Sequence, residues 1–155
     1  MKEIKLTQGL VALVDDEDYE WLNQWKWYAL KSCNTYYATR VVRKNTICTR
    51  IAMHRLIMGN PPCIVDHVDT DGLHNYRSNL RECTKSQNGM NRLPNKNSIY
   101  KGVRKSPTKG KWRGMIQVDG KCICLGTFNT KKDVAIAYNN AAIKYFGEFA
   151  RLNEL

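Results

Sequence analysis

The chain has 155 residues, of which 43% are hydrophobic and 10% aromatic, enough for one domain or two small ones and too apolar for wholesale disorder. Its 25 basic and 14 acidic residues give a net charge of +11 at pH 7, which is typical of proteins that bind a polyanion. Residues 94–155 hold 12 of the basic residues and only 4 of the acidic ones, so nucleic-acid contact is predicted mainly there.

The first 51 residues predict a β-rich region. Aromatic and β-branched runs typical of strands occur at 9–14, 26–31, 36–42 and 46–51. Asp15 and Asp18 occupy the positions of a helix cap and of its capping-box partner, so a short helix is expected between the first two runs. Trp21, Trp25 and Trp27 are interpreted as core residues rather than as platforms for bases.

The next region, 52–92, is predicted to alternate short elements. Residues 52–59 have the composition of a short helix, and 63–68 and 79–83 that of two strands. Thr84 is a suitable N-cap for a following helix. The expected order is therefore helix, strand, loop, strand and helix.

Metal-binding and proton-transferring side chains are concentrated between the two strands of this region. The run Asp69-Thr70-Asp71-Gly72 resembles part of a calcium loop, but the register would place His67 and Ser78 where carboxylates are required. A polar turn explains the run as well. Neither explains why Asp66 and His67 end an apolar strand, where one side chain can bind a metal and the other can reach a water molecule.

After a polar linker at 93–98, residues 99–155 predict three strands and one helix. Alternation in 111–118 directs Trp112, Gly114, Ile116 and Val118 to one face and Lys111, Arg113, Met115 and Gln117 to the other. Asp119-Gly120 is a strong hairpin turn before the third strand, 121–128. Thr130 and Asp133 predict the start of a helix that runs to Gly147.

The segment 54–88 closely resembles the HNH endonucleases, in the form found in bacteriophage and intron-encoded homing enzymes. The resemblance is carried by His54-Arg55-Leu56, Asp66-His67, Asn75, Asn79-Leu80-Arg81 and Gln87-Asn88. It departs at His74, where many members carry Asn. The resemblance implies a ββα-metal fold that hydrolyses a DNA phosphodiester bond with one divalent ion, Mg²⁺ or alternatively Mn²⁺.

The same resemblance implies roles for individual residues. Asp66 and Asn88 would bind the metal, His67 would be the general base, and Asn79 would brace the loop and help to orient His67. An imidazole titrates near neutral pH, and a hard cation on oxygen ligands stabilises a phosphodiester transition state. His54 either packs its helix or contributes to the site, and Arg81 either contacts a phosphate or pairs with a carboxylate such as Glu82.

Residues 99–155 resemble the plant ethylene-response-factor DNA-binding domain of the APETALA type. The matching residues are Tyr100 to Arg104, Lys111-Trp112, Leu125 to Phe128, Ala135, Ala137-Tyr138, Ala141-Ala142, Gly147 and Leu152-Asn153. The resemblance implies a sheet in the DNA major groove, with contacts from Lys101, Arg104, Lys111, Arg113 and Gln117. Cys122 and Cys124 stand where plant members carry Arg and Trp, so the plant target sequence is not carried over.

Together these patterns predict an α+β protein with an N-terminal β-rich region (1–51), an HNH unit (52–92), a linker (93–98) and a DNA-binding domain (99–155). The expected function is cleavage of double-stranded DNA by a monomer. The alternative is a non-catalytic DNA-binding regulator with a relic HNH unit. No stretch of about 18 apolar residues predicts a membrane span, and without a C-x-x-C pair or a signal peptide a cytoplasmic location is expected, in a bacterium or a phage-infected host cell.

Overall fold

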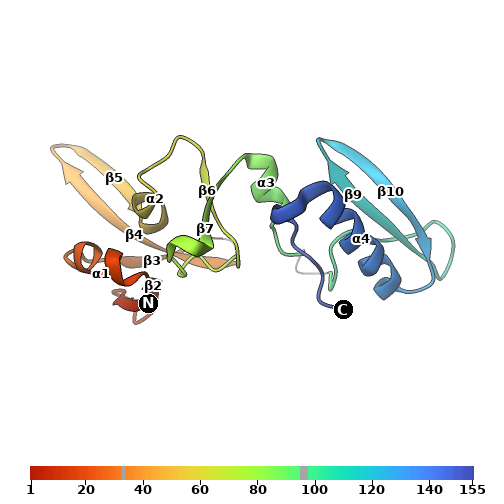
Figure 1. Cartoon of the computed structure of the whole chain (residues 1–155), viewed down its shortest axis with the longest axis horizontal. Coiled ribbons are helices and arrows are strands. Elements are labelled where there is room, and N and C mark those ends of the chain that lie inside the picture. Colours follow the sequence, from red (N-terminus) through yellow and green to blue (C-terminus); the bar gives the residue numbers. More distant parts are fainter. Residues whose placement is uncertain (33, 95–97) are drawn as a thin grey trace. The chain divides into compact units, whose positions relative to one another are not determined.

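The computed structural model describes residues 1–32, 34–94 and 98–155, and within them the protein is α+β, with several small antiparallel sheets and four α-helices (Figure 1). The chain divides into two compact units, residues 1–84 and 85–155. Part of the predicted linker, residues 95–97, lies outside the described residues. None of the described helices is long and apolar enough to cross a membrane.

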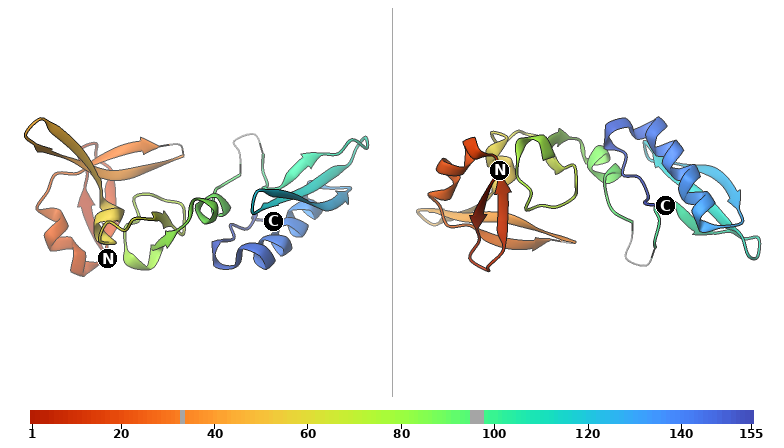
Figure 2. Two further views of the ribbon diagram at one scale, coloured as in Figure 1. Left: turned by 90° about the horizontal axis from the view of Figure 1, so that it is seen from above. Right: turned by 60° about the horizontal axis from the view of Figure 1, so that its bottom comes forward.

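The first unit begins with small antiparallel sheets and a short helix. The strands β1 (Lys2–Lys5) and β2 (Val11–Val14) pair with each other, and α1 (Asp16–Asn23) follows. The next sheet has the order β3 (Tyr28–Ser32), β4 (Thr35–Lys44), β5 (Ile47–Ala52), and it leads into α2 (Met53–Ile57). Because β4 pairs with β3 through its first half and with β5 through its second, the β4–β5 hairpin extends beyond β3 (Figure 2).

The core of the first unit confirms the interpretation of Trp27 as a buried residue. Trp27 is 1% exposed, and its indole N–H donates a hydrogen bond to the carbonyl of Leu22 at 2.9 Å. Ile4 lies between exposed residues on β1, Val14 follows the half-buried Leu13 on β2, and both bury their side chains in the same core. Because its indole N–H is hydrogen-bonded inside the core, Trp27 is buried without an unsatisfied hydrogen-bond donor.

The predicted strands around the polar cluster are present as β6 (Ile64–His67) and β7 (Leu80–Cys83). They pair antiparallel, with Asp66 opposite Arg81 and His67 opposite Leu80. A 3₁₀ turn, η1 (Arg77–Asn79), directly precedes β7. The consecutive residues Asp66 and His67 therefore lie at the end of β6, where the connecting loop begins.

The second unit contains the predicted three-stranded sheet and helix. It comprises α3 (Lys85–Met90), β8 (Val103–Lys105), β9 (Trp112–Val118), β10 (Lys121–Phe128), α4 (Lys131–Phe146) and η2 (Gly147–Phe149), with the sheet order β10-β9-β8. The helix α4 lies along one face of the sheet (Figures 1 and 2). Gly114 and Ile116 are buried while Gln117 is exposed, which confirms the predicted alternation.

Helix capping was predicted correctly in one unit and wrongly in the other. The Thr130 hydroxyl accepts a hydrogen bond from the Asp133 backbone N–H at 3.1 Å at the start of α4. Asp15 makes no side-chain cap bond to α1. Its carboxylate instead accepts from the backbone N–H of Arg77 at 2.7 Å, so a partner distant in sequence has replaced the local one.

Candidate functional site

The loop between β6 and β7 is held in place by the N-terminal region. The Leu13 N–H donates to the Leu73 carbonyl at 2.9 Å, and the Asn75 N–H donates to the Leu13 carbonyl at 2.7 Å. Gly72 packs so closely that an added Cβ would lie 2.5 Å from the Tyr36 carbonyl oxygen and 2.6 Å from the Tyr37 ring. Residues 72–75 therefore depend on the first strands of the chain for their position.

Within this loop, Asp69 and Asn79 form a reciprocal pair. The Asp69 N–H donates to Asn79 Oδ1 at 3.0 Å, and Asn79 Nδ2 donates to Asp69 Oδ1 at 2.9 Å. Asp69 Oδ1 also accepts from the Asp71 N–H at 2.9 Å, and Thr70 has a φ of 73°, a conformation that β-branched residues rarely adopt. The run at 69–72 is therefore a tightly braced turn, and Asn79 is its brace.

His67 is buried, with 4% of its surface exposed, and its Nε2 lies 3.3 Å from Asn75 Oδ1. Asn75 Nδ2 donates to the Leu73 carbonyl at 3.0 Å and to the Gly72 carbonyl at 3.4 Å. Since two acceptors face the NH₂ group, the amide oxygen faces His67, and Nε2 carries the proton of that hydrogen bond. The neutral ring therefore has its lone pair on Nδ1.

Asn75 is the functional candidate that the sequence did not assign a role. It matched the family motif, but orientation of His67 was expected from Asn79. In the structure the Asn79 side chain bonds to Asp69 and to the His74 carbonyl, whereas Asn75 bonds to the imidazole. The signal was available in its position, because an Asn that follows a turn can be buried only with its amide fully paired, and Asn75 is 0% exposed.

Three aromatic rings surround the buried end of β6. The ring centroids of His54 and His67 lie 5.0 Å apart, and the Tyr37 ring lies 5.4 Å from His54 and 5.7 Å from His67. Among the described residues, His54 Nδ1 is buried without a hydrogen-bond partner. Burial, with a smaller contribution from His67, lowers the pKa of His54 to about 3, and burial also lowers the pKa of His67. Both rings are therefore neutral near pH 7, and the His54 ring packs against those of Tyr37 and His67.

Acid should destabilise the first unit because of His54. An ordinary imidazole has a pKa of 6.5, so the unfolded chain binds a proton that the folded unit excludes down to about pH 3. Stability is complete above pH 6.5 and falls by about 2 kcal/mol between pH 6.5 and 5. Urea unfolding, followed by tryptophan fluorescence in a Trp112→Phe background, reports on the first unit because the other tryptophans lie there.

A His54→Phe variant is the matched control for this acid sensitivity. Phe keeps a ring against Tyr37 and His67 but cannot bind a proton. We expect its loss of stability between pH 6.5 and 5 to be smaller than that of the parent by at least about 1 kcal/mol, the remainder arising from His67. An equal loss in both proteins would exclude His54 as a source of the acid sensitivity.

Asp66 is 8% exposed and pairs with Arg81, whose Nη2 lies 2.9 Å and Nε 3.1 Å from Asp66 Oδ2. The predicted alternative of a pair with Glu82 is not found. Glu82 instead accepts from the Cys63 thiol at 2.8 Å. Arg81 on β7 thus pairs across the hairpin with the buried carboxylate of Asp66 and neutralises it.

The metal ligands predicted from the sequence, Asp66 and Asn88, are oxygen donors of the kind that Mg²⁺ accepts. Within residues 1–32, 34–94 and 98–155, no group of three or more His, Cys, Asp or Glu side chains gathers to hold a metal. Asn88 lies on α3, which belongs to the second unit.

An ion pair between the exposed Arg77 and the buried Asp18 links α1 to the start of η1. Arg77 Nε lies 2.9 Å from Asp18 Oδ2, and Arg77 Nη2 lies 2.8 Å from Asp18 Oδ1. Asp18 is 2% exposed and also accepts from the Trp21 indole N–H at 3.1 Å. This bidentate pair raises the pKa of Arg77 and anchors the C-terminal side of the loop to the N-terminal region.

The second unit presents a basic row on the outer face of its sheet. The strand register places Arg104 opposite Arg113, and Arg113 opposite Thr127. Arg113 Nε is buried and has no hydrogen-bond partner among the described residues. Like charges directly opposite each other are unfavourable in a sheet, so this row gains stability when an anion neutralises it. Farther along the same face, Gln117 lies opposite Cys122 and Met115 opposite Cys124.

The remaining two predicted DNA contacts differ in their surroundings. Lys111 is exposed just before β9, at the end of the sheet that carries Arg104 and Arg113. Lys101 is only partly exposed, and its Nζ lies 2.5 Å from the carbonyl oxygen of Met90, within its own unit. The geometry therefore groups Arg104, Lys111, Arg113 and Gln117, and it places the Lys101 ammonium group in another environment.

Comparisons with known proteins match both resemblances. An uncharacterized HNH endonuclease of Acanthamoeba polyphaga mimivirus is 31% identical over 150 residues, covering 96% of this chain and 77% of the relative. An ethylene-responsive transcription factor of Arabidopsis thaliana is 44% identical over 61 residues, covering 35% of this chain and 37% of the plant protein. A dehydration-responsive element-binding protein of the same plant is 38% identical over 78 residues, covering 49% of this chain and 36% of the relative. No family model matches the chain.

Proposed function

Because this chain belongs to the HNH endonuclease family, we propose that it hydrolyses phosphodiester bonds of double-stranded DNA, with β6, β7 and α3 as the ββα unit of that family. Asp66 and Asn88 are the proposed ligands of one divalent ion, Mg²⁺ or Mn²⁺. His67 is the proposed general base. The proposal includes action as a monomer, for which a single site predicts a nick in one strand.

The observation that carries this proposal is the environment of His67. A buried imidazole has its Nε2–H held by Asn75 and follows directly, on β6, the buried residue Asp66. Burial lowers the pKa of His67, so the ring is in its basic form near neutral pH. A neutral imidazole with a fixed tautomer beside a carboxylate is the arrangement required for proton abstraction at a metal-dependent site.

The residues of the chain would act in the following way. His67 Nδ1 takes a proton from the attacking water, and Asn75 keeps the ring oriented by accepting the hydrogen bond from Nε2. Asn79 and Asp69 keep the loop rigid, so the ring does not rotate away. The ion, when bound, supplies positive charge to the phosphate and to the leaving oxygen. Arg81 is positioned beside Asp66 and can add positive charge near a bound phosphate.

The test is incubation of supercoiled plasmid with the full chain and Mg²⁺, Mn²⁺ or EDTA. Conversion to nicked circles with either ion, and none in EDTA, is the expected result. Asp66→Asn is the matched variant, since it keeps the side-chain shape and removes the charge that attracts a cation. Absence of cleavage with every ion, together with retained duplex binding, would reject the nuclease and support the non-catalytic DNA-binding regulator.

We further propose that the outer face of the second sheet positions the enzyme on its duplex. Arg104, Lys111, Arg113 and Gln117 would face the DNA. Two observations support this orientation: the similarity to a plant transcription factor and to a plant element-binding protein, and the Arg113 Nε atom, which has no hydrogen-bond partner among the described residues. A bound phosphate would relieve the repulsion between Arg104 and Arg113.

Arg113→Ala should weaken duplex binding and reduce its salt dependence. If Arg113 neutralises one phosphate, the slope of log K against log salt concentration falls in magnitude by about one. Fluorescence anisotropy of a labelled duplex in EDTA, at several salt concentrations, measures both quantities. Lys132→Ala, an exposed cation on α4, is the control and should leave the slope unchanged. A parent-like slope in Arg113→Ala would remove this residue from the interface.

A further inference from the structure

The side chain and backbone of Lys101 are both held by other parts of the second unit. Lys101 Nζ donates to the carbonyl of Met90, the last residue of α3, at 2.5 Å. The Lys101 N–H donates to Asn153 Oδ1 at 2.6 Å, and Asn153 Nδ2 donates to the Lys101 carbonyl at 3.3 Å. Asn139 on α4 holds the Asn153 backbone through bonds of 2.8 and 2.9 Å. These bonds fix the position of the Lys101 backbone, from which the ammonium group extends.

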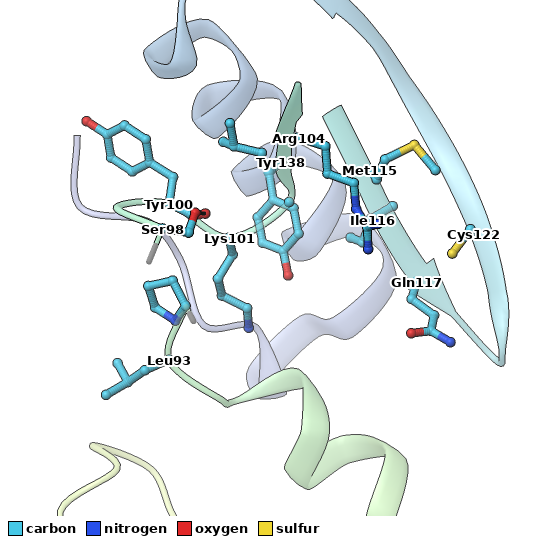
Figure 3. Close-up of a pocket in the computed structure, with 13 residues that line it drawn as sticks. Leu93, Ser98, Tyr100, Lys101, Arg104, Met115, Ile116, Gln117, Cys122 and Tyr138 are labelled. Carbon is cyan, nitrogen blue, oxygen red and sulfur yellow. Dashed lines mark hydrogen bonds between the residues drawn. The ribbon is translucent and has the colours of Figure 1, made fainter. Parts of the chain in front are cut away.

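The neighbourhood of Lys101 is also sterically defined. Gly102 has a φ of +76°, and a Cβ there would lie 2.2 Å from the Tyr138 ring. The Lys101 ammonium lies 5.8 Å from the centroid of that ring, and Figure 3 shows the side chain running beside Tyr138 along a pocket of about 480 Å³. Burial, with a smaller contribution from Arg151, lowers the pKa of Lys101 to about 8. This partly buried ammonium is costly unless its contact with α3 compensates.

The helix that Lys101 contacts needs an external anchor. α3 has six residues, none of them buried, and helices of this length have little stability of their own in water. Its end is attached to the unit through Met90, which packs against the core formed by Ile116, Tyr138 and Phe146. The carbonyl groups at the end of a helix lack intrahelical partners and attract cations. The Lys101 ammonium satisfies one of these carbonyls.

We propose that Lys101 is a positioning residue for Asn88, and that it acts by holding the C-terminal end of α3 on the core of the second unit. This inference rests on the proposed function, in which Asn88 is a metal ligand. It replaces the expectation that Lys101 contacts a DNA phosphate. The folded unit that carries the proposed DNA-binding face also carries one proposed metal ligand, and Lys101 connects the two.

Lys101→Met tests the inference, because it keeps the apolar stem and removes the ammonium group. Both proteins carry His67→Ala, so that the duplex stays intact during the measurement. Electron paramagnetic resonance of free Mn²⁺ gives the affinity of the full chain for the ion in the presence of duplex. We expect Lys101→Met to weaken Mn²⁺ binding by about tenfold, as the loss of supporting contacts around a metal site does. Duplex affinity in EDTA should stay within twofold of the parent value, and its salt slope should be unchanged.

The matched variant is Lys101→Arg, for which the adjacent pocket offers room. It restores a cation at the end of α3 and should bring Mn²⁺ affinity back to within threefold of the parent. If Lys101→Met lowers the thermal stability of the second unit, the Arg variant and amide hydrogen exchange at residues 87–91 still decide the question. Faster exchange there in Lys101→Met, with parent-like exchange in Lys101→Arg, supports the anchoring role.

Three results would overturn the inference, and they differ in meaning. A salt slope reduced by about one in Lys101→Met, with parent-like Mn²⁺ affinity, identifies Lys101 as a phosphate contact. If Mn²⁺ affinity, the salt slope and amide hydrogen exchange in Lys101→Met all match the parent, Lys101 only packs against its neighbours. Absence of Mn²⁺ binding in the parent itself rejects the proposed function, and the inference falls with it.

Discussion

His67→Ala should lower the rate of plasmid cleavage by about a thousandfold while leaving duplex affinity unchanged. General bases typically contribute 10²- to 10⁴-fold, and His67 is the only imidazole among the described residues that both bonds to Asn75 and neighbours Asp66. Single-turnover cleavage with excess protein isolates the chemical step from product release. Anisotropy in EDTA supplies the duplex affinity.

The chain offers a matched control for this experiment in His74. This imidazole lies on the same loop but is about one-third exposed and pairs with Asp69 at 2.6 Å. We expect His74→Ala to lower the cleavage rate less than tenfold. If the two variants lose activity equally, the proposed base is wrong, and the loss reflects the loop as a whole.

Asn75→Ala should lower the cleavage rate by more than His74→Ala does and by less than His67→Ala does. The substitution leaves the imidazole in place but removes the acceptor that holds its Nε2–H, so a tenfold to hundredfold loss is expected. Asn79→Ala tests the bracing role separately, because Asn79 bonds to Asp69 and the His74 carbonyl. A variant at Asn75 with full activity would show that the tautomer of His67 is set by something else.

Arg77→Ala should destabilise the first unit by about 3 kcal/mol. The reason lies in Asp18, which is 2% exposed and would retain only the Trp21 indole among the side-chain bonds described above. The Arg77 side chain is 46% exposed. The expected cost therefore arises from the buried Asp18 carboxylate that loses its partner. Urea unfolding by tryptophan fluorescence in the Trp112→Phe background measures the change.

Two further variants make this prediction specific. Lys2→Ala removes a pair with Glu20 on the same helix, but that pair is exposed and 3.4 Å long, so a change of less than about 0.5 kcal/mol is expected. The double variant Asp18→Leu with Arg77→Met should recover most of the stability, because it removes both charges together. A loss in the double variant as large as that of Arg77→Ala would contradict a role for the unpaired carboxylate.

Much of the fold could be predicted because its signals are local. The alternation from Trp112 to Val118, the Asp119-Gly120 turn and the Thr130 cap each depend on residues within a few positions of each other. β1 was not predicted, since its four residues include three charged ones and its partner strand supplies the burial. Its formation depends on pairing with β2, which a local pattern does not reveal.

The candidate site was predictable in its residues but less so in their contacts. The motifs identified Asp66, His67 and Asn79, and the turn chemistry at 69–72 was confirmed. Asp15 was expected to cap the helix beside it, and Arg81 to contact a phosphate or a carboxylate such as Glu82, whereas the structure pairs Asp15 with Arg77 and Arg81 with Asp66. Side chains choose partners across strands by geometry and burial, and spacing along the chain contains little of that information.

The contact between β2 and the loop at 73–75 bears on how this nuclease motif could be moved between proteins. A segment 52–92 would carry every motif residue, yet it would lack Leu13, whose backbone pairs with Leu73 and Asn75. It would also lack Tyr36 and Tyr37, against which Gly72 packs. Grafted alone onto another scaffold, the motif would bring the reactive groups without the strands that orient them. The smallest transferable cassette therefore includes β2 and β4 in addition to residues 52–92.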